Sequence, residues 1–393
     1  MNNLQHTPDG VRDIYGDECA RKIFVKNELF SLIKSFGYCP IQTPSFEYFD
    51  VFGLDVGTTP SRELYKFFEH EGHTMVLRPD FTPSVARAYA KYFKESNVPV
   101  RFLYEGSSFS NPVNYRGRLN ETAQIGAELM GERSIDSDAE IIALNAGCFE
   151  KAGLCDFIIS IGDSGIFRAV FDAAKMDEDT EKEFKEYICS KNYFAAEKLS
   201  EEKNYSKEVT RCFKELPNLS GGVEMLDDAA LIFSSFPRAK EAILRLKDVY
   251  NIIAEYGYDK YVAFDLSLLS PYDYYTGIIF EGFSFGTGEA ISKGGRYDEL
   301  LGKFGKDAPA VGMVIMIDSL MSSLDRQKID IGKKEEKTVI IYSSKYRIDA
   351  INKAKELRKS QRSSSLVLYD DLKNDTETDD YYKSIGYDVV RMI

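Results

Sequence analysis

The chain has 393 residues, 44% of them hydrophobic and 29% charged, and its 50 basic against 63 acidic side chains give a net charge of −13. This composition predicts a globular protein with two or three domains and a large core. No apolar run reaches the about 20 residues of a membrane helix. No signal peptide is visible either, so we expect a cytoplasmic protein without membrane contact. The acidic balance argues weakly against a nucleic-acid partner.

The first third of the chain alternates helices with short extended segments. The apolar spacing of residues 17–36 predicts a helix that ends at Gly37. An extended strand is expected over 38–47, with prolines at its margins. Residues 62–69 and 74–78 predict a hairpin that turns at Glu71-Gly72, and Pro83 stands near the start of a helix over 84–92.

The middle of the chain predicts two strands, 100–110 and 121–131, joined by an Arg/Asn/Gly loop and followed by a helix over 136–152. Residues 170–247 are mostly helical in pattern and are interpreted as an insertion. Strands return at 262–268, 278–283, 291–292 and 311–317. The segment Tyr272–Glu281 is aromatic-rich and is interpreted as a strand, followed by a diglycine turn at Gly294-Gly295 and by Tyr297. Together these segments predict the floor of a small polar-ligand pocket.

The charged stretch 326–337 predicts a linker between two domains, 1–325 and 338–393. The second domain has the strand and helix pattern of a small βαβαβ unit. Because strands and helices are mixed and the pattern favours antiparallel pairing of many strands, the predicted class is α+β rather than a doubly wound sheet. The six cysteines form no CxxC pair, and the three histidines at 6, 70 and 73 are few and clustered. We therefore expect reduced thiols, no metal and no cofactor.

Five segments in order resemble the histidyl branch of the class II aminoacyl-tRNA synthetases over nearly the whole chain. They are Thr7–Asp13, Gly37–Glu47, Arg101–Gly131, Tyr272–Glu281 and Ala310–Met313. The second resembles the dimer-forming motif 1, the third motif 2 and the last the start of motif 3. The resemblance implies an antiparallel sheet flanked by helices, and a C-terminal unit that is a shortened version of the anticodon-binding domain.

The resemblance also implies a histidine-binding pocket, built from Asp80, Thr82, Gln124, Glu128, Tyr274, Tyr275 and Tyr297. Asp80 and Thr82 offer the acceptors that an ammonium group needs, with help from Gln124. Glu128 would accept an imidazole N–H, and the three tyrosines would form the walls. Outside such a pattern, a Gln or Glu on a strand usually faces solvent and a tyrosine pair is usually part of a core. Arg116 and Arg118 either contact an anion or lie in solvent.

Three arginines of the synthetases have no counterpart here. The aligned positions are Ser110 in motif 2, Ser270 before the tyrosine pair and Ser319 in motif 3. Adenylate formation joins two anions and depends on preorganised cations, each worth about 3–4 kcal/mol of barrier. Serine has neither the charge nor the bidentate geometry of arginine. The sequence therefore predicts a synthetase-like chain that does not activate an amino acid.

Retention of the histidine pocket with loss of the arginines resembles the family of ATP phosphoribosyltransferase regulatory subunits. That resemblance implies a partner, the short catalytic chain, in a hetero-octamer built on synthetase-like dimers. It also implies feedback by L-histidine and no tRNA ligand. Two alternatives stay open, an active histidyl-tRNA synthetase of unusual chemistry and a free-standing amino-acid sensor.

Overall fold

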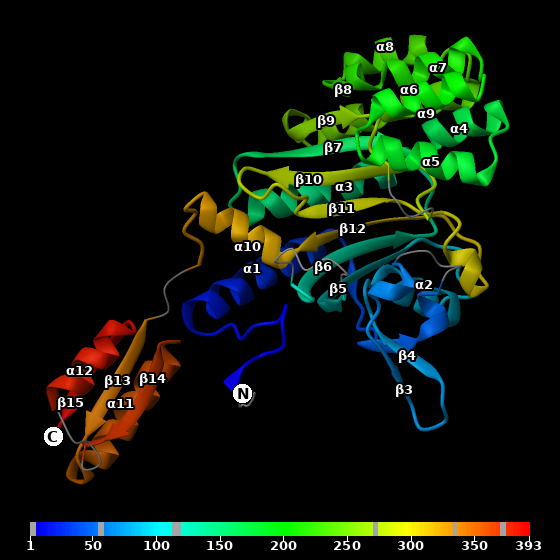
Figure 1. Cartoon of the computed structure of the whole chain (residues 1–393). Coiled ribbons are helices and arrows are strands. Elements are labelled where there is room, and N and C mark those ends of the chain that lie inside the picture. The colour runs from blue at the N-terminus through cyan, green and yellow to red at the C-terminus, as the bar shows by residue number, and fades with distance from the viewer. Residues whose placement is uncertain (1–4, 54–58, 112–118, 270–273, 333–335, 370–374) are drawn as a thin grey trace. The chain divides into compact units, whose positions relative to one another are not determined.

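The computed structural model describes residues 5–53, 59–111, 119–269, 274–332, 336–369 and 375–393 (Figure 1). The chain divides into two compact units, Met1–Ile331 and Gly332–Ile393. Each unit is described by itself below. Helices and mainly antiparallel strands are mixed along the first unit, which confirms the predicted α+β class.

A nine-stranded sheet runs through the described part of the first unit, in the order β1-β5-β6-β12-β11-β10-β7-β9-β8. Neighbours are antiparallel except for the pairs β1–β5 and β7–β9, which are parallel. The strands are β1 (Cys39–Pro40), β5 (Val100–Phe109), β6 (Glu121–Met130), β7 (Phe157–Asp163), β8 (Ser220–Gly221), β9 (Val262–Asp265), β10 (Ile278–Ser284), β11 (Ser292–Arg296) and β12 (Ala310–Met316).

Side chains alternate between the two faces of this sheet, and each face has its own core. Leu103 and Ile125 face the core that contains Val25 of α1 (Gly16–Ser35), where α3 (Ile135–Lys151) and α10 (Ile317–Arg326) also pack. Tyr104 points the other way and joins Phe81 and the helix α2 (Thr82–Tyr92). The second face, with α2, carries the candidate site.

The segment predicted as one strand over 38–47 is two short strands in different sheets, so that prediction is wrong. β1 belongs to the large sheet, whereas β2 (Phe46–Tyr48) pairs with β4 (Thr74–Leu77), which pairs in turn with β3 (Lys66–Phe68). Pro40 and Pro44 have no N–H to donate, so a continuous ladder cannot form between them. The Arg78 guanidinium instead donates to the carbonyl oxygens of Thr43 (2.9 Å) and Pro44 (3.3 Å). The predicted turn at Gly72 is present, with φ +88°.

Two details of the aromatic and diglycine segments also differ from the prediction. Tyr274 and Tyr275 precede β10 rather than belonging to it, and Gly294-Gly295 lies inside β11 rather than in a turn. A Cβ on Gly294 would lie only 2.5 Å from the Gly312 carbonyl oxygen of the next strand. Glycine is therefore used here for close packing within the sheet, and not for reversal of the chain.

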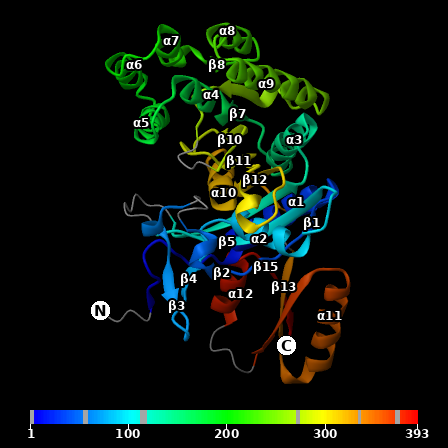
Figure 2. The same ribbon diagram turned by 90° about the vertical axis from the view of Figure 1, so that its right-hand side faces the viewer.

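The predicted helical insertion is present and extends beyond 170–247 at both ends. Its helices are α4 (Ser164–Ala174), α5 (Glu178–Cys189), α6 (Tyr193–Glu202), α7 (Lys207–Lys214), α8 (Met225–Ile232) and α9 (Pro237–Glu255). Because β7 and β9 are parallel neighbours, the chain needs such a crossover between them. Figures 1 and 2 show these helices gathered beside the β7–β9 end of the sheet.

The second unit is a small parallel sheet of order β14-β13-β15 with a helix in each crossover. Its elements are β13 (Lys337–Tyr342), α11 (Arg347–Lys359), β14 (Ser363–Leu368), α12 (Asp375–Ser384) and β15 (Tyr387–Met392). Ile340 of the central strand packs against Ala350, Ala354 and Leu357 of α11. This is the βαβαβ pattern that the sequence predicts.

Candidate functional site

A cavity of about 480 Å³ lies on the α2 face of the large sheet. Its size falls within the range of about 300–1,000 Å³ that is usual for small-molecule sites. All seven residues that the sequence assigned to a ligand pocket line it: Asp80, Thr82, Gln124, Glu128, Tyr274, Tyr275 and Tyr297. Segments up to about two hundred residues apart in the chain therefore meet at one place, as the sequence predicts.

Glycines on three neighbouring strands let large side chains lie against the sheet beside the cavity. A Cβ on Gly126 of β6 would overlap the ring of Tyr104, and one on Gly312 of β12 would overlap the carboxyl group of Glu128. On β11, a Cβ on Gly295 would lie 2.7 Å from the ring of Tyr275. The missing side chains let these large and polar groups lie along the sheet and leave space above it.

Glu128 is the most buried polar group of the cavity, with 1% of its surface exposed. Its carboxyl group accepts a hydrogen bond from the Thr82 hydroxyl (2.7 Å) and one from the Tyr297 hydroxyl. Among the described residues no lysine or arginine forms an ion pair with it. Burial raises the pKa of Glu128 to about 8, and the nearby Asp80 acts in the same direction. The carboxyl group is therefore largely protonated at neutral pH unless a ligand supplies positive charge.

Polar acceptors stand next to Glu128, where α2 begins. The Asp80 carboxylate accepts from the backbone N–H of Thr82 (3.1 Å), and burial raises the pKa of Asp80. The Thr82 hydroxyl donates to Glu128, which leaves its oxygen free to accept. The Oε1 atom of Gln124 is buried and accepts no hydrogen bond from the described residues. Buried acceptors without donors are uncommon, so these groups match a ligand that donates several hydrogen bonds.

The tyrosines form one wall of the cavity. The rings of Tyr274 and Tyr275 are stacked with centroids 4.3 Å apart, and Tyr297 lies 6.0 Å from Tyr274. The carbonyl oxygen of Tyr275 accepts from the hydroxyl of Ser164 (3.1 Å) and from the guanidinium of Arg168 (3.4 Å). Both donors belong to α4, so the first helix of the insertion holds this wall in place.

The backbone beside Tyr297 is fixed by a buried ion-pair network. Arg296 donates to the Asp138 carboxylate (2.8 Å) and to the hydroxyl of Ser137 (2.8 Å), and Asp138 also accepts from Arg245 of α9 (2.6 Å). The Asp138 side chain has no exposed surface. Because two cations satisfy it, this carboxylate supports the fold and is not available to a ligand.

Some of the predicted residues lie elsewhere. Arg116, Arg118 and Ser270 fall outside the described residues. Ser110 lines the cavity, whereas Ser319 belongs to α10 and is absent from the lining. The sequence interpretation missed the two charged lining residues Glu281 and Lys293, whose side chains form an ion pair (2.9 Å). Lys293 immediately precedes the diglycine, and this position in the sequence could have identified it as a lining residue.

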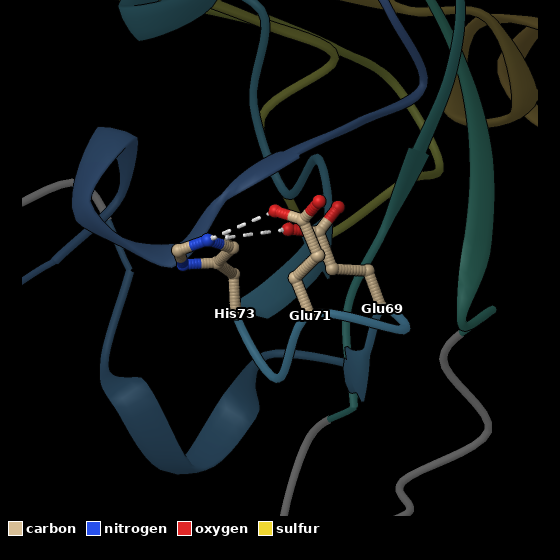
Figure 3. A group of neighbouring side chains, drawn as sticks. All are labelled: Glu69, Glu71 and His73. Carbon is tan, nitrogen blue, oxygen red and sulfur yellow. Dashed lines mark ion pairs between the residues drawn. The ribbon is translucent and has the colours of Figure 1, made fainter.

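A separate cluster of possible metal ligands lies on the β3–β4 hairpin. Figure 3 shows the side chains of Glu69, Glu71 and His73 turned toward one another, and their ligand atoms lie within 4.8 Å of one another. His73 lies 3.7 Å from each carboxylate and would form ion pairs when protonated. Glu71 and His73 are exposed, so the cluster matches a solvated turn as well as a metal site.

Comparisons with known proteins place the chain beside two related groups. A profile of the family described as Histidyl-tRNA synthetase matches residues 10–320. The ATP phosphoribosyltransferase regulatory subunit of Acetivibrio thermocellus is 33% identical, over 90% of this chain and 84% of that protein. The subunit of the same name from Clostridium kluyveri is 31% identical, over 96% of each chain.

Solved structures share the fold. A structure from Bacillus halodurans, described as an ATP phosphoribosyltransferase regulatory subunit/histidyl-tRNA synthetase, superposes with a TM-score of 0.88. It is 28% identical, and the match covers 99% of this chain and 98% of that one. The histidyl-tRNA synthetase of Nostoc matches with a TM-score of 0.80 at 20% identity, over 97% of this chain and 89% of that one, which supports the fold alone. In the part of the chain that the structure describes, every helix is too short or too polar to span a membrane.

Proposed function

Because the chain belongs to the family of ATP phosphoribosyltransferase regulatory subunits, we propose that its cavity binds L-histidine and that this binding regulates a short catalytic chain. The observation that carries the proposal is the buried carboxyl group of Glu128, which has hydroxyl donors but no cation among the described residues. An imidazole ring supplies the N–H, and after protonation the charge, that this group lacks.

The α-amino group of histidine accounts for the remaining acceptors. An ammonium group carries three N–H donors. Asp80 supplies a carboxylate, and the oxygens of Thr82 and Gln124 supply neutral acceptors on the same side of the cavity. The positive charge of the ligand would also lower the pKa of Asp80, which burial raises.

The same cavity supports a non-catalytic role. Amino-acid activation requires cations around the phosphate and the carboxylate, and removal of one such donor costs about 3–4 kcal/mol. Ser110 stands at the position of one synthetase arginine and lines the cavity. Lys293 is the one cation among the described lining residues. These residues therefore lack the positive charge that a bound nucleoside triphosphate needs. We propose that the chain neither activates histidine nor charges tRNA.

The proposed partner is the short catalytic chain of ATP phosphoribosyltransferase, in an assembly of four regulatory and four catalytic chains built on synthetase-like dimers. The regulatory chain would be required for full activity of its partner. Histidine would act by binding one arrangement of the assembly more tightly than the other, which shifts the population between them. Couplings of this kind are typically about 1–3 kcal/mol.

Calorimetry with the full chain tests the pocket. Histidine is expected to bind the unmodified chain, and Glu128→Gln is expected to lower its affinity at least tenfold, because the amide cannot become the anion that pairs with an imidazolium. Glu121→Gln is the matched control, since Glu121 lies on the same strand but is exposed and outside the cavity. Unchanged histidine affinity in Glu128→Gln would remove the basis of the assignment.

Two further measurements separate the alternatives. A complex with the catalytic chain should lose activity when histidine is added, and the complex that carries Glu128→Gln should resist that inhibition. Histidine-dependent exchange of pyrophosphate into ATP is expected to stay at background. Measurable exchange would instead favour an active synthetase, and failure to associate with the catalytic chain would favour a free-standing sensor.

A further inference from the structure

We propose that Lys293 is the residue that binds the carboxylate of the amino-acid ligand. The inference rests on the proposed function, because it concerns the same cavity and the same ligand. Lys293 lies on β11 and lines the cavity, and its side chain is 55% exposed. The described lining contains three carboxyl groups, those of Asp80, Glu128 and Glu281, and no cation besides this lysine.

A bound amino acid needs a positive partner at its carboxylate end. The synthetase-like chain has Ser110 in the cavity where an arginine would otherwise stand, and a serine hydroxyl supplies no charge. The three carboxyl groups favour the ammonium and the imidazole of the ligand but repel its carboxylate. Without a cation the cavity would therefore select an amine rather than an amino acid.

Lys293 is positioned to supply that cation. It is the cross-strand partner of Glu281 on β10, and both side chains point to the cavity face of the sheet. Lys293 is in register with Gly126 of β6, so it lies two strand spacings across and two residues along the sheet from Glu128, a separation of about 12 Å. The flexible stem of a lysine and the length of an amino acid together span such a distance. Gly312 and Val314 of the intervening strand β12 line the same cavity, with Val314 opposite Lys293 and Gly312 opposite Glu128.

The ion-pair partner of Lys293 is easily exchanged. Its ammonium group forms an ion pair with Glu281 at 2.9 Å, and neither side chain is deeply buried. Ion pairs between partly exposed groups contribute little net free energy, because solvent and salt screen them. A ligand carboxylate can therefore take the place of Glu281 at Lys293, while Glu281 turns to solvent. In this arrangement Glu281 competes with the ligand.

This competition predicts effects of opposite sign for the two members of one ion pair. Lys293→Met is expected to weaken histidine binding about tenfold, since the ligand carboxylate loses its charge partner. Glu281→Gln is expected to strengthen histidine binding by a few fold, since it removes both the competitor and a repulsive charge. A purely structural ion pair would give the same sign for both variants.

The test is calorimetry of the full chain with two ligands, histidine and histidinol, which keeps the amino and imidazole groups but has no carboxylate. Lys293→Met should weaken binding of histidine and leave binding of histidinol within twofold. Lys94→Met, an exposed lysine outside the cavity, serves as the control and should change neither.

Each other outcome overturns the inference in a recognisable way. Equal weakening of both ligands by Lys293→Met would mean that the lysine only supports the cavity. Unchanged histidine binding in that variant would mean that another group holds the carboxylate, while the proposed function stands. If the unmodified chain binds neither ligand, the proposed function itself fails and this inference fails with it.

Discussion

Two buried carboxyl groups only ten residues apart have opposite surroundings. Asp138 has no exposed surface and is satisfied by two arginines, Arg296 and Arg245. Glu128 is 1% exposed and accepts hydrogen bonds from the hydroxyls of Thr82 and Tyr297. Asp138 therefore has its charge partners within the protein. Glu128 has no cationic partner among the described residues, and its pKa is about 8.

The difference separates a carboxylate that supports the fold from one that, in our proposal, binds a ligand. A buried charge is tolerated when counter-charges and hydrogen bonds satisfy it, as at Asp138. A buried carboxyl group without such partners costs stability and persists where it has another use. Burial of a carboxyl group alone therefore does not indicate a binding site. The groups that pair with the carboxyl group are the better indicator.

The largest expected effect comes from the satisfied group. Asp138→Asn leaves Arg296 and Arg245 without their shared anion, and loss of one partner of a buried ion pair typically costs about 3–5 kcal/mol. The free energy of unfolding, measured by urea denaturation, should fall by about 3–5 kcal/mol. Asp136→Asn, an exposed neighbour in the first turn of α3, should change it by less than about 1 kcal/mol. Equal losses in the two variants would erase the distinction between the two buried carboxyl groups.

A smaller effect is expected when the space around Glu128 is filled. Gly312→Ala places a methyl group against the Glu128 carboxyl group, and overpacking of this kind costs about 1–3 kcal/mol. Histidine binding should be lost at the same time. Gly53→Ala is the control, because a Cβ there would make ordinary contacts at 3.7 Å. A stable Gly312→Ala chain that still binds histidine would show that Glu128 can move aside.

The pH dependence of stability gives the finest test. Because the pKa of Glu128 is raised in the folded chain from 4.5 to about 8, the folded state holds more protons than the unfolded state between these values. The contribution of Glu128 to the free energy of unfolding is fully present below pH 4.5 and is lost as the pH rises to 8. The loss is at most about 1.4 kcal/mol per pH unit. Stability should fall over this window, and the decline should be shallower in Glu128→Gln.

Asp163 acts in the same direction, since burial raises its pKa to about 7. The measured quantity is therefore the difference between the slopes of the unmodified chain and of Glu128→Gln, and not the slope of either chain alone. Identical slopes would mean that Glu128 is ionised in the folded protein across the whole range, which contradicts the contrast with Asp138.

Much of the fold follows from local patterns in the sequence. The helices α1, α2 and α3, the long strands β5 and β6, and the C-terminal βαβαβ unit were predicted because apolar spacing is a property of short segments, whereas α10 was not predicted. The seven cavity residues were found because their motifs resemble those of a known family. The predicted turn at Gly294-Gly295 was wrong because glycine also serves close strand packing, and only the neighbouring strand reveals which use applies.

Cross-strand partners could not be read from the sequence. Lys293 and Glu281 are twelve residues apart, and their pairing depends on the register between β10 and β11. The Asp138–Arg296 network joins positions 158 residues apart and likewise depends on the assembled sheet. Such contacts decide which buried carboxyl group is satisfied, so the sequence could propose Glu128 as a ligand group but could not explain why Asp138 is not one.

The glycines under the cavity have a consequence for mutation. Every change at Gly126, Gly295 or Gly312 adds atoms, and at each position the first added carbon already meets a neighbouring group. Any substitution of these glycines therefore reduces the space beside the sheet and cannot enlarge it. Glycine is therefore the one residue type at these three positions that leaves Tyr104, Glu128 and Tyr275 where they lie against the sheet.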